Sequence, residues 1–178
     1  TGATVLMGLN EDVLKTCSIS SNASCTTNAV SPVIAIMQES VGIEKALLNT
    51  VHAYTSTQSL VDCPAKNDFR RGRAAAQNLV PASTGSAIAV TQVATELENL
   101  FDGIAIRVPV ITGSIIDLTF IAKRNTTVEE VNTILKKAAS EERWRDTFTT
   151  TEEQLVSSDI VGSKYGSMAD LNFTRVVG

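Results

Sequence analysis

Segments with helical spacing and segments with strand character follow one another along this chain without a regular strand–helix–strand alternation. Apolar residues at helical spacing predict helices, and β-branched runs bounded by turn residues predict strands. The predicted helices cover 29–42, 85–101 and 126–142, and the predicted strands cover 4–10, 43–55, 103–110, 113–123, 155–162 and 167–178. This mixture favours an α+β fold, with a largely antiparallel, mixed sheet and helices on one face.

The composition is that of an ordinary globular chain. It has 178 residues, of which 43% are hydrophobic and 19% charged, so we expect a real core. The net charge of −4 gives no general reason to expect nucleic acid or a membrane as partner. No apolar run reaches membrane-spanning length and no signal peptide is seen, and because the chain does not begin with methionine we expect it to be part of a longer protein.

Three cysteines without a CxxC pair and a single histidine argue against a disulfide framework and against a metal site. A reduced, cytoplasmic setting fits this cysteine usage.

The stretch "SSNASCTTNAVSP" (20–32) places Cys25 just ahead of a predicted helix, for which Ser24 or Thr26 can serve as N-cap and which Gly42 ends. A helix N-terminus and a neighbouring imidazolium both favour the reactive thiolate. His52 is the only histidine and lies at the end of the following strand, so contact with Cys25 is geometrically reasonable. The alternative is a buried free cysteine and a hydrogen-bonded core histidine. Cys17 and Cys63 lack both features.

A second group of residues suits an anion. "PASTGSA" (81–87) places Thr84 and Gly85 at a predicted helix N-terminus, where N–H groups and a hydroxyl can hold phosphate. The long segment 56–78 has no clean period and carries "FRRGR", and Arg107 lies inside an apolar strand, where a charge needs a partner. A helix cap, a solvated basic turn and a structural ion pair are the alternatives. Together with an activated thiol, these groups suggest a site for phosphorylated substrates.

Four motifs in order, "SNASCTTN" (21–28), "VHAYT" (51–55), "STG" (83–85) and "RVP" (107–109), resemble phosphorylating glyceraldehyde-3-phosphate dehydrogenase. The resemblance extends over essentially the whole chain, including "RRGRAAAQN", "IIDLT" and "LVSSDIVG". It implies oxidation of glyceraldehyde 3-phosphate to 1,3-bisphosphoglycerate. Cys25 would attack the aldehyde, with His52 as base and the Cys25 N–H at the oxyanion. Hydride would pass to NAD, and inorganic phosphate would cleave the thioester.

The resemblance also assigns the binding residues. Thr55 and Arg107 match the family's site for the substrate's own phosphate. The site for the attacking phosphate matches Ser24, Thr26, Arg71, Thr84 and Gly85. Segment 55–78 resembles the loop that lines the cofactor site of a neighbouring subunit in a tetramer, and Pro64 resembles the NAD-preferring form of that loop.

The resemblance further implies the organisation of the chain. Residues 1–18 match the last strand and linker of an NAD-binding domain that is otherwise missing, and 19–178 match the catalytic domain. No glycine fingerprint for a nucleotide phosphate occurs in the sequence, and the family's tail beyond residue 178 is absent. We therefore expect the 178-residue chain to be inactive alone. The residue that separates NAD from NADP would lie in the missing domain, so NADP is not excluded.

Other functions stay open at this point. Erythrose-4-phosphate dehydrogenases share the cysteine and the histidine, although intact "HAYT" and "STG" favour the triose enzyme. Aspartate-semialdehyde dehydrogenases share a Cys–His pair but not the phosphate-site motifs. A Cys–His acyl-transfer or hydrolase domain without any nucleotide is a third possibility, and a non-catalytic, truncated oligomerisation domain is a fourth.

Overall fold

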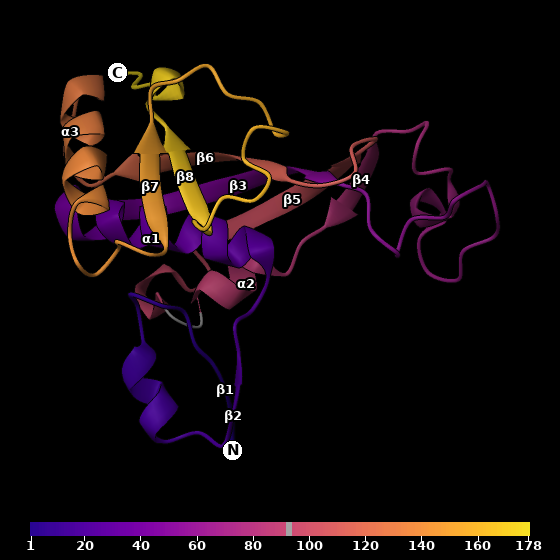
Figure 1. The fold of residues 1–178 in the computed structure, drawn as a ribbon, viewed down its shortest axis with the longest axis horizontal. Coiled ribbons are helices and arrows are strands. Elements are labelled where there is room, and N and C mark those ends of the chain that lie inside the picture. The colour runs from indigo at the N-terminus through magenta and orange to yellow at the C-terminus, as the bar shows by residue number, and fades with distance from the viewer. Residues whose placement is uncertain (92–93) are drawn as a thin grey trace.

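The main sheet has four strands in the order β4-β5-β3-β6 (Figure 1). The computed structural model describes residues 1–91 and 94–178. The strands are β3 (Ile43–Ala53), β4 (Val80–Ser83), β5 (Phe101–Val108) and β6 (Ser114–Ala122). β3 runs parallel to β5 and antiparallel to β6, and β4 is antiparallel to β5. The predicted α+β class with a mixed sheet is confirmed.

Helix α1 (Cys25–Ser40) packs on one face of this sheet, together with the shorter α2 (Ser86–Thr91). The Ser24 hydroxyl caps α1 by accepting from the Thr27 N–H at 3.1 Å. At the other end Gly42 has φ +71°, a conformation that glycine adopts without strain, so the chain turns directly into β3. Local cap and stop signals thus set both ends of this helix, as the sequence predicts.

Helix α3 (Val128–Ala139) is capped by Thr127, whose hydroxyl accepts from the Glu130 N–H at 3.2 Å. It packs against α1 and β7. β7 (Phe148–Thr151) pairs in parallel with β8 (Ser167–Asp170), which itself contacts α1. A second parallel pair, β1 (Gly2–Thr4) with β2 (Ile19–Ser21), extends away from the body at the N-terminus (Figure 1). Short 3-10 helices cover Glu11–Lys15, Phe69–Gly72, Thr95–Leu97 and Leu171–Phe173.

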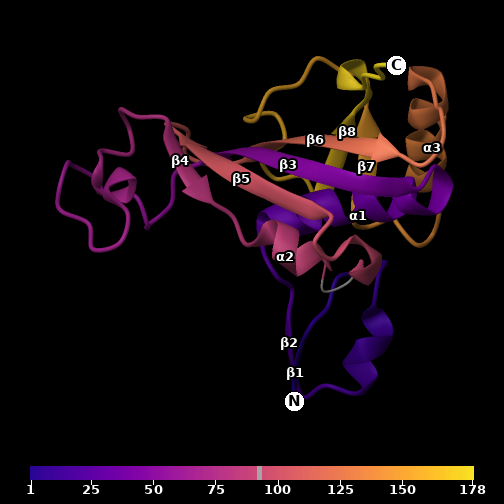
Figure 2. The same ribbon diagram turned by 180° about the vertical axis from the view of Figure 1, so that it is seen from behind.

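The core lies between the sheet and these elements. The inward residues of β3 alternate with outward ones, so Leu48 is buried while Leu47 is 64% exposed. Ile34 and Met37 of α1 meet Leu48 and Trp144 in one buried cluster. Seen from behind, β3 and β5 pass in front of β7 and β8 (Figure 2). One face of the main sheet is therefore packed and the other is open.

The predicted strand over 4–10 is wrong except at its first residue, because β1 ends at Thr4. Beyond it, the Asn10 side chain accepts from the Leu6 N–H at 2.8 Å and donates to the Thr4 carbonyl at 3.0 Å. These bonds fold the segment into a turn, and asparagine is more favourable in a turn than in a strand. Gly8 takes φ +82° in that turn.

The predicted strand over 155–162 is also wrong. The Asp159 carboxylate accepts from the Val156 N–H at 2.7 Å and closes a turn there, and the strand forms earlier, as β7. β4 is a strand that the sequence analysis missed. The predicted helix over 85–101 is shorter in the structure, with α2 ending at Thr91 and a 3-10 turn at Thr95–Leu97. Residues 92–93 of that prediction lie outside the described residues.

The segment between β3 and β4 extends far from the body (Figure 1). Apart from the 3-10 turn, its described structure consists of turns and a single bridge between Ser59 and Ala74. The Asp62 carboxylate accepts from the Ala74 N–H at 2.8 Å and pairs with Arg73 at 3.1 Å. The long loop predicted over 56–78 is confirmed.

Candidate active site

Cys25 is the first residue of α1, and the turn before it holds the chain in place. Ala23 has φ +56°, a left-handed conformation that is uncommon for a residue with a Cβ. The Asn28 amide donates to the carbonyl oxygens of Asn22 at 2.6 Å and Ser24 at 2.9 Å, and so fixes this turn. The first N–H groups of a helix lack intrahelical partners. The N-terminal end of α1 is therefore electropositive, and Cys25 is exposed there.

His52 reaches Cys25 from the sheet. Its Nε2 lies 3.1 Å from the Cys25 Sγ. Because β3 and β5 are parallel, their carboxyl ends lie side by side, and the register pairs His52 with Arg107. The chain thus places a thiol, an imidazole and a guanidinium at one corner of the fold, from three separate elements.

Arg107 is the half-buried cation of this corner. Its Nη1 lies 2.6 Å from His52 Nδ1 and donates to the Ala53 carbonyl at 3.2 Å, while its Nε is buried without a partner. Burial lowers the pKa of the Arg107 guanidinium, the charge of Cys25 opposes that shift, and the nearby charge of Arg71 adds to it. The group still remains protonated. A half-buried cation whose buried Nε–H has no partner is a ready partner for an anion.

A chain of hydroxyls links the N-termini of α1 and α2. Ser24 Oγ lies 2.7 Å from the Thr27 hydroxyl and 3.1 Å from Ser86 Oγ, which accepts from the Thr84 hydroxyl at 3.0 Å. The space beside Gly85 is open, since a Cβ built there meets nothing within 4 Å. Two helix ends and their hydroxyls therefore face one another next to Cys25, which suits a tetrahedral oxyanion.

A second hydroxyl cluster follows β3. The hydroxyl oxygens of Thr55 and Thr57 lie 2.9 Å apart, and both contact the side-chain amide of Gln58. Thr55 comes two residues after Ala53, whose carbonyl accepts from Arg107. The cluster thus continues the polar corner formed by His52 and Arg107.

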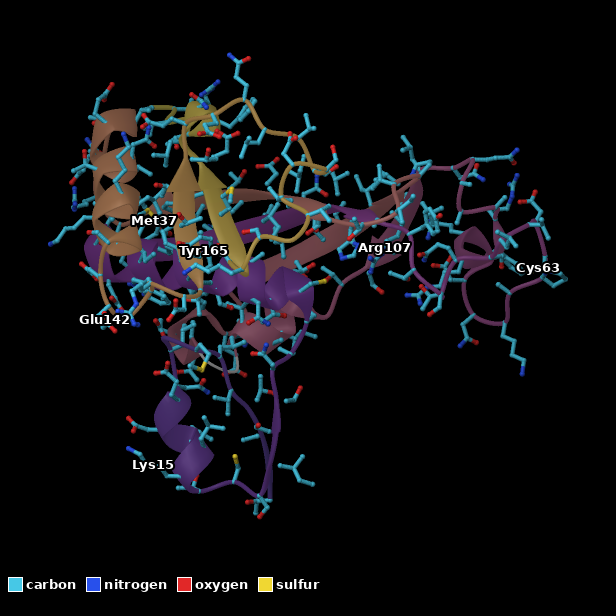
Figure 3. The ribbon with its side chains drawn as sticks, viewed as in Figure 1. Lys15, Met37, Cys63, Arg107, Glu142 and Tyr165 are labelled. Carbon is cyan, nitrogen blue, oxygen red and sulfur yellow. The ribbon has the colours of Figure 1, made fainter. Side chains whose placement is uncertain are left out.

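Not every predicted site residue joins this corner. Pro64 follows Cys63, which lies at the far end of the long loop, well away from Arg107 (Figure 3). Arg71 Nε lies 4.0 Å from Asp68 Oδ2. Its positive charge is near enough to help lower the pKa of Arg107. Thr26 is buried in the first turn of α1. Within one chain, therefore, Pro64 is separate from the site, while Arg71 influences it electrostatically through Arg107.

A cavity of about 410 Å³ opens beside Cys25. Its lining combines polar groups of the α1 turn, such as Asn22 and Asn28, with apolar side chains of the N-terminal segment, such as Leu6 and Met7. A ligand group with both polar and apolar surface would find partners for each in this lining. In the described ranges, 1–91 and 94–178, no three His, Cys, Asp or Glu side chains gather as a metal site would require.

Comparison with known proteins identifies the family. Residues 24–178 match the model of the glyceraldehyde 3-phosphate dehydrogenase C-terminal domain. The chain belongs to the glyceraldehyde-3-phosphate dehydrogenase family. It is 47% identical over 169 residues to the glyceraldehyde-3-phosphate dehydrogenase of Clostridium pasteurianum, covering 94% of this chain and 49% of that one. It is 45% identical over 175 residues to the Streptomyces coelicolor protein, covering 97% and 52%.

A eukaryotic relative gives the same result. Glyceraldehyde-3-phosphate dehydrogenase B of Aspergillus oryzae is 42% identical over 180 residues, covering 97% of this chain and 54% of that one. The chain thus spans about half the length of the curated relatives that it matches. The part of the glyceraldehyde-3-phosphate dehydrogenase family that it represents is the C-terminal domain.

Sequence reasoning missed three residues that shape this candidate site. Asn28 fixes the turn before Cys25, Ser86 joins the hydroxyl chain, and Gln58 holds the two threonines. Asn28 already ends the "SCTTN" motif, and its spacing of four from Ser24 suits a side chain that reaches back one helical turn. No helix among the described residues has the length and apolar character needed to cross a membrane.

Proposed function

We propose that this chain supplies the thiol half of a phosphorylating glyceraldehyde-3-phosphate dehydrogenase, which oxidises glyceraldehyde 3-phosphate to 1,3-bisphosphoglycerate. The observation that carries the proposal is the 3.1 Å contact between Cys25 Sγ and His52 Nε2 at the N-terminus of α1. Arg107 beside this pair and the two hydroxyl clusters supply anion-binding groups on either side. Family membership gives the reaction class.

The first step forms a thiohemiacetal. The Cys25 thiol gives its proton to His52 Nε2, and its sulfur attacks the aldehyde carbon, so that a C–S bond forms as the C=O π bond opens. The N–H groups of the first turn of α1 stabilise the oxyanion. His52 Nε2 then returns its proton to that oxygen.

The second step leaves an acyl group on Cys25. The carbon loses a hydride and its hydroxyl proton returns to His52, giving a thioester. NAD, when bound, supplies the hydride acceptor. The nicotinamide end of that cofactor would lie in the cavity lined by Asn28 and Leu6, beside Cys25. The nucleotide end would need groups beyond these 178 residues, so we expect no turnover from the chain alone. NAD and NADP share this nicotinamide end, so the lining of the cavity does not discriminate between them.

The third step releases the product. Inorganic phosphate, held by the hydroxyls of Ser24, Thr84 and Ser86 and beside Gly85, attacks the thioester carbon. The C–S bond breaks, and Cys25 leaves as a thiolate facing His52. The substrate's own phosphate would lie against Arg107 and Thr55, where it balances the charge of the half-buried guanidinium. By the family resemblance, Thr26 and Arg71 would also belong to the attacking-phosphate site.

We further propose that copies of this chain associate through the open sheet face, which we define by Leu47, Ile104, Ile115 and Ile121. Each of these side chains is at least half exposed. The register places Lys45 beside Ile121 and Leu47 beside Asp102, so one apolar patch carries charges of both signs. A second copy related by a two-fold axis can bury such a patch and pair those charges. An oligomer of this kind would also allow Pro64 to approach a neighbour's cofactor. Cytoplasmic location is part of the same proposal.

Alkylation of the three cysteines tests the thiol chemistry. We expect iodoacetamide at neutral pH to modify Cys25 at least tenfold faster than Cys17 and Cys63, because, of the three, Cys25 has a helix N-terminus and an imidazole nitrogen 3.1 Å from its sulfur. Peptide mass spectrometry measures the three rates in the same sample. His52→Ala should slow Cys25 alone. Equal rates for all three cysteines would contradict the proposed nucleophile and favour a non-catalytic assembly domain.

A further inference from the structure

Gln58 is a buried amide in an otherwise exposed turn. It is 7% exposed, whereas its neighbours Thr57 and Leu60 are exposed. Its Oε1 accepts from the Thr55 N–H at 2.9 Å and from the Thr55 hydroxyl at 3.0 Å. Its Nε2 donates to the Thr57 hydroxyl oxygen at 2.9 Å. The side chain therefore contacts both threonines of the cluster.

The turn itself does not need this side chain. The Gln58 N–H donates to the Thr55 carbonyl at 3.0 Å, which closes a four-residue turn through the backbone. The amide adds three further bonds, all within the cluster. Burying a polar group that the turn does not require points to a role for its orientation.

The orientation of the amide follows from its partners. A backbone N–H can only donate, so the atom facing Thr55 N is the amide oxygen and the one facing Thr57 is the NH₂ group. Thr57 accepts from Gln58, which leaves the Thr57 hydroxyl proton free for another acceptor. The closest is Thr55 Oγ, at 2.9 Å. Gln58 thus sets the direction in which the hydroxyl protons of the cluster point.

We propose that Gln58 is a positioning residue, which holds the Thr55 side chain in place and leaves the Thr57 hydroxyl as a donor for the phosphate of the aldehyde substrate. This inference rests on the proposed function, because it requires a phosphorylated substrate beside Arg107 and Thr55. When the anion arrives, its oxygens replace Thr55 Oγ as acceptor of the Thr57 proton, while the Gln58 amide keeps both side chains in place. Gln58 itself does not touch the substrate.

The test compares two aldehydes on the 178-residue chain. Glyceraldehyde 3-phosphate and glyceraldehyde both form a thiohemiacetal with Cys25, and the two adducts differ only in the phosphate group. Each aldehyde therefore protects that thiol from iodoacetamide, and the ratio of their protection constants measures the contribution of the phosphate to binding. The variants are Gln58→Met, which keeps the length without the hydrogen bonds, and Gln58→Glu, which keeps the acceptor but loses the donor. Gln77→Glu, at an exposed position of the same loop, is the matched control.

We expect the preference for the phosphorylated aldehyde to fall about tenfold or more in both Gln58 variants, since charge-assisted hydrogen bonds to the anion lose their geometry. Protection by glyceraldehyde, and the alkylation rate of Cys25 without ligand, should stay unchanged, as should the preference in Gln77→Glu. A preference that survives in Gln58→Glu or Gln58→Met overturns the positioning role. A wild-type chain with no preference at all overturns the proposed function instead, and this inference with it.

Discussion

Arg107 Nη1 lies 2.6 Å from His52 Nδ1, and the same nitrogen of the imidazole lies 2.7 Å from the Ala53 carbonyl oxygen. These two contacts use Nδ1 in opposite senses. A guanidinium only donates, so Nδ1 must be bare to accept from Arg107, whereas it must carry a proton to donate to Ala53. In the first arrangement Nε2 carries the ring proton and faces Cys25 as a donor. In the second, Nε2 is free to take the thiol proton.

An anion that draws Arg107 toward itself should therefore switch the tautomer of His52. Because this is the only histidine, its two ring ¹⁵N signals can be assigned without ambiguity. We expect the Nε2–H tautomer in the free chain and the Nδ1–H tautomer once phosphate is added. Arg107→Leu should show the second tautomer with or without phosphate, and Arg73→Leu should behave as wild type. A tautomer that is insensitive to both phosphate and Arg107→Leu would disprove the coupling.

Gly8 fastens the N-terminal segment to the body. It has φ +82°, and a Cβ placed on it would lie 2.6 Å from a ring carbon of Trp144. Gly8→Ala should lower the free energy of unfolding by about 2–4 kcal/mol, from backbone strain and overpacking together. Gly162→Ala is the control, since Gly162 has φ +86° but open space around it, and it should cost about 1–2 kcal/mol. Urea denaturation measures both, and equal losses would exclude a contribution from the Trp144 contact.

The open sheet face makes a prediction about mass in solution. Ile115→Glu places a charge among the apolar side chains of this face, and we expect it to convert the oligomer to monomer at micromolar concentration. Val177→Glu introduces the same charge at a 97% exposed position away from the sheet and should leave the mass unchanged. Light scattering after size-exclusion chromatography reports both. An Ile115→Glu chain that retains the wild-type mass would argue for another interface.

Asp62 makes the long loop sensitive to acid. The Ala74 N–H, and after it Arg73, hold the pKa of this carboxyl below its usual range. A group with a lowered folded-state pKa stabilises the native loop above its unfolded pKa, and this contribution is lost as the pH falls through the folded value. Hydrogen-exchange protection over 59–75, corrected for intrinsic rates, should therefore fall on acidification below about pH 4. In the Asp62→Asn chain, residues 59–75 should be weakly protected at every pH. In the Asp12→Asn chain, their protection should match that of the wild type.

The parts of the fold that the sequence predicts well depend on local chemistry. Ser24 and Gly42 set the ends of α1 through a cap and a positive φ, which neighbouring residues suffice to signal. β4 and β7 are four-residue strands whose pairing partners lie elsewhere in the chain, so periodicity gives them little signal. The helical spacing over 85–101 continues past the point where α2 ends, because spacing does not report where the sheet needs β5 to begin.

The candidate site divides in the same way. Cys25 and His52 are expected to approach one another because a helix returns the chain to the end of a strand, and the structure places them in contact. Their chemical roles remain predictions. The contact between Arg107 and His52 depends on the parallel register of β3 and β5, which the sequence analysis did not specify. The sequence does not point to Gln58, because its proposed role, orienting the threonine hydroxyls, depends on a turn that no periodic pattern signals.

The pleat of β3 places two sets of side chains with different roles on opposite faces of a single strand. Leu48 and His52 point toward α1 and the chemistry, and Leu47 lies on the opposite side. Substitutions at alternate positions can therefore change how copies meet without touching the thiol, and the reverse holds as well. Deleting one residue from the middle of β3 would exchange the two sets, carrying His52 or its partners to the wrong side of the sheet. Length in this strand should consequently be far less tolerant of change than composition.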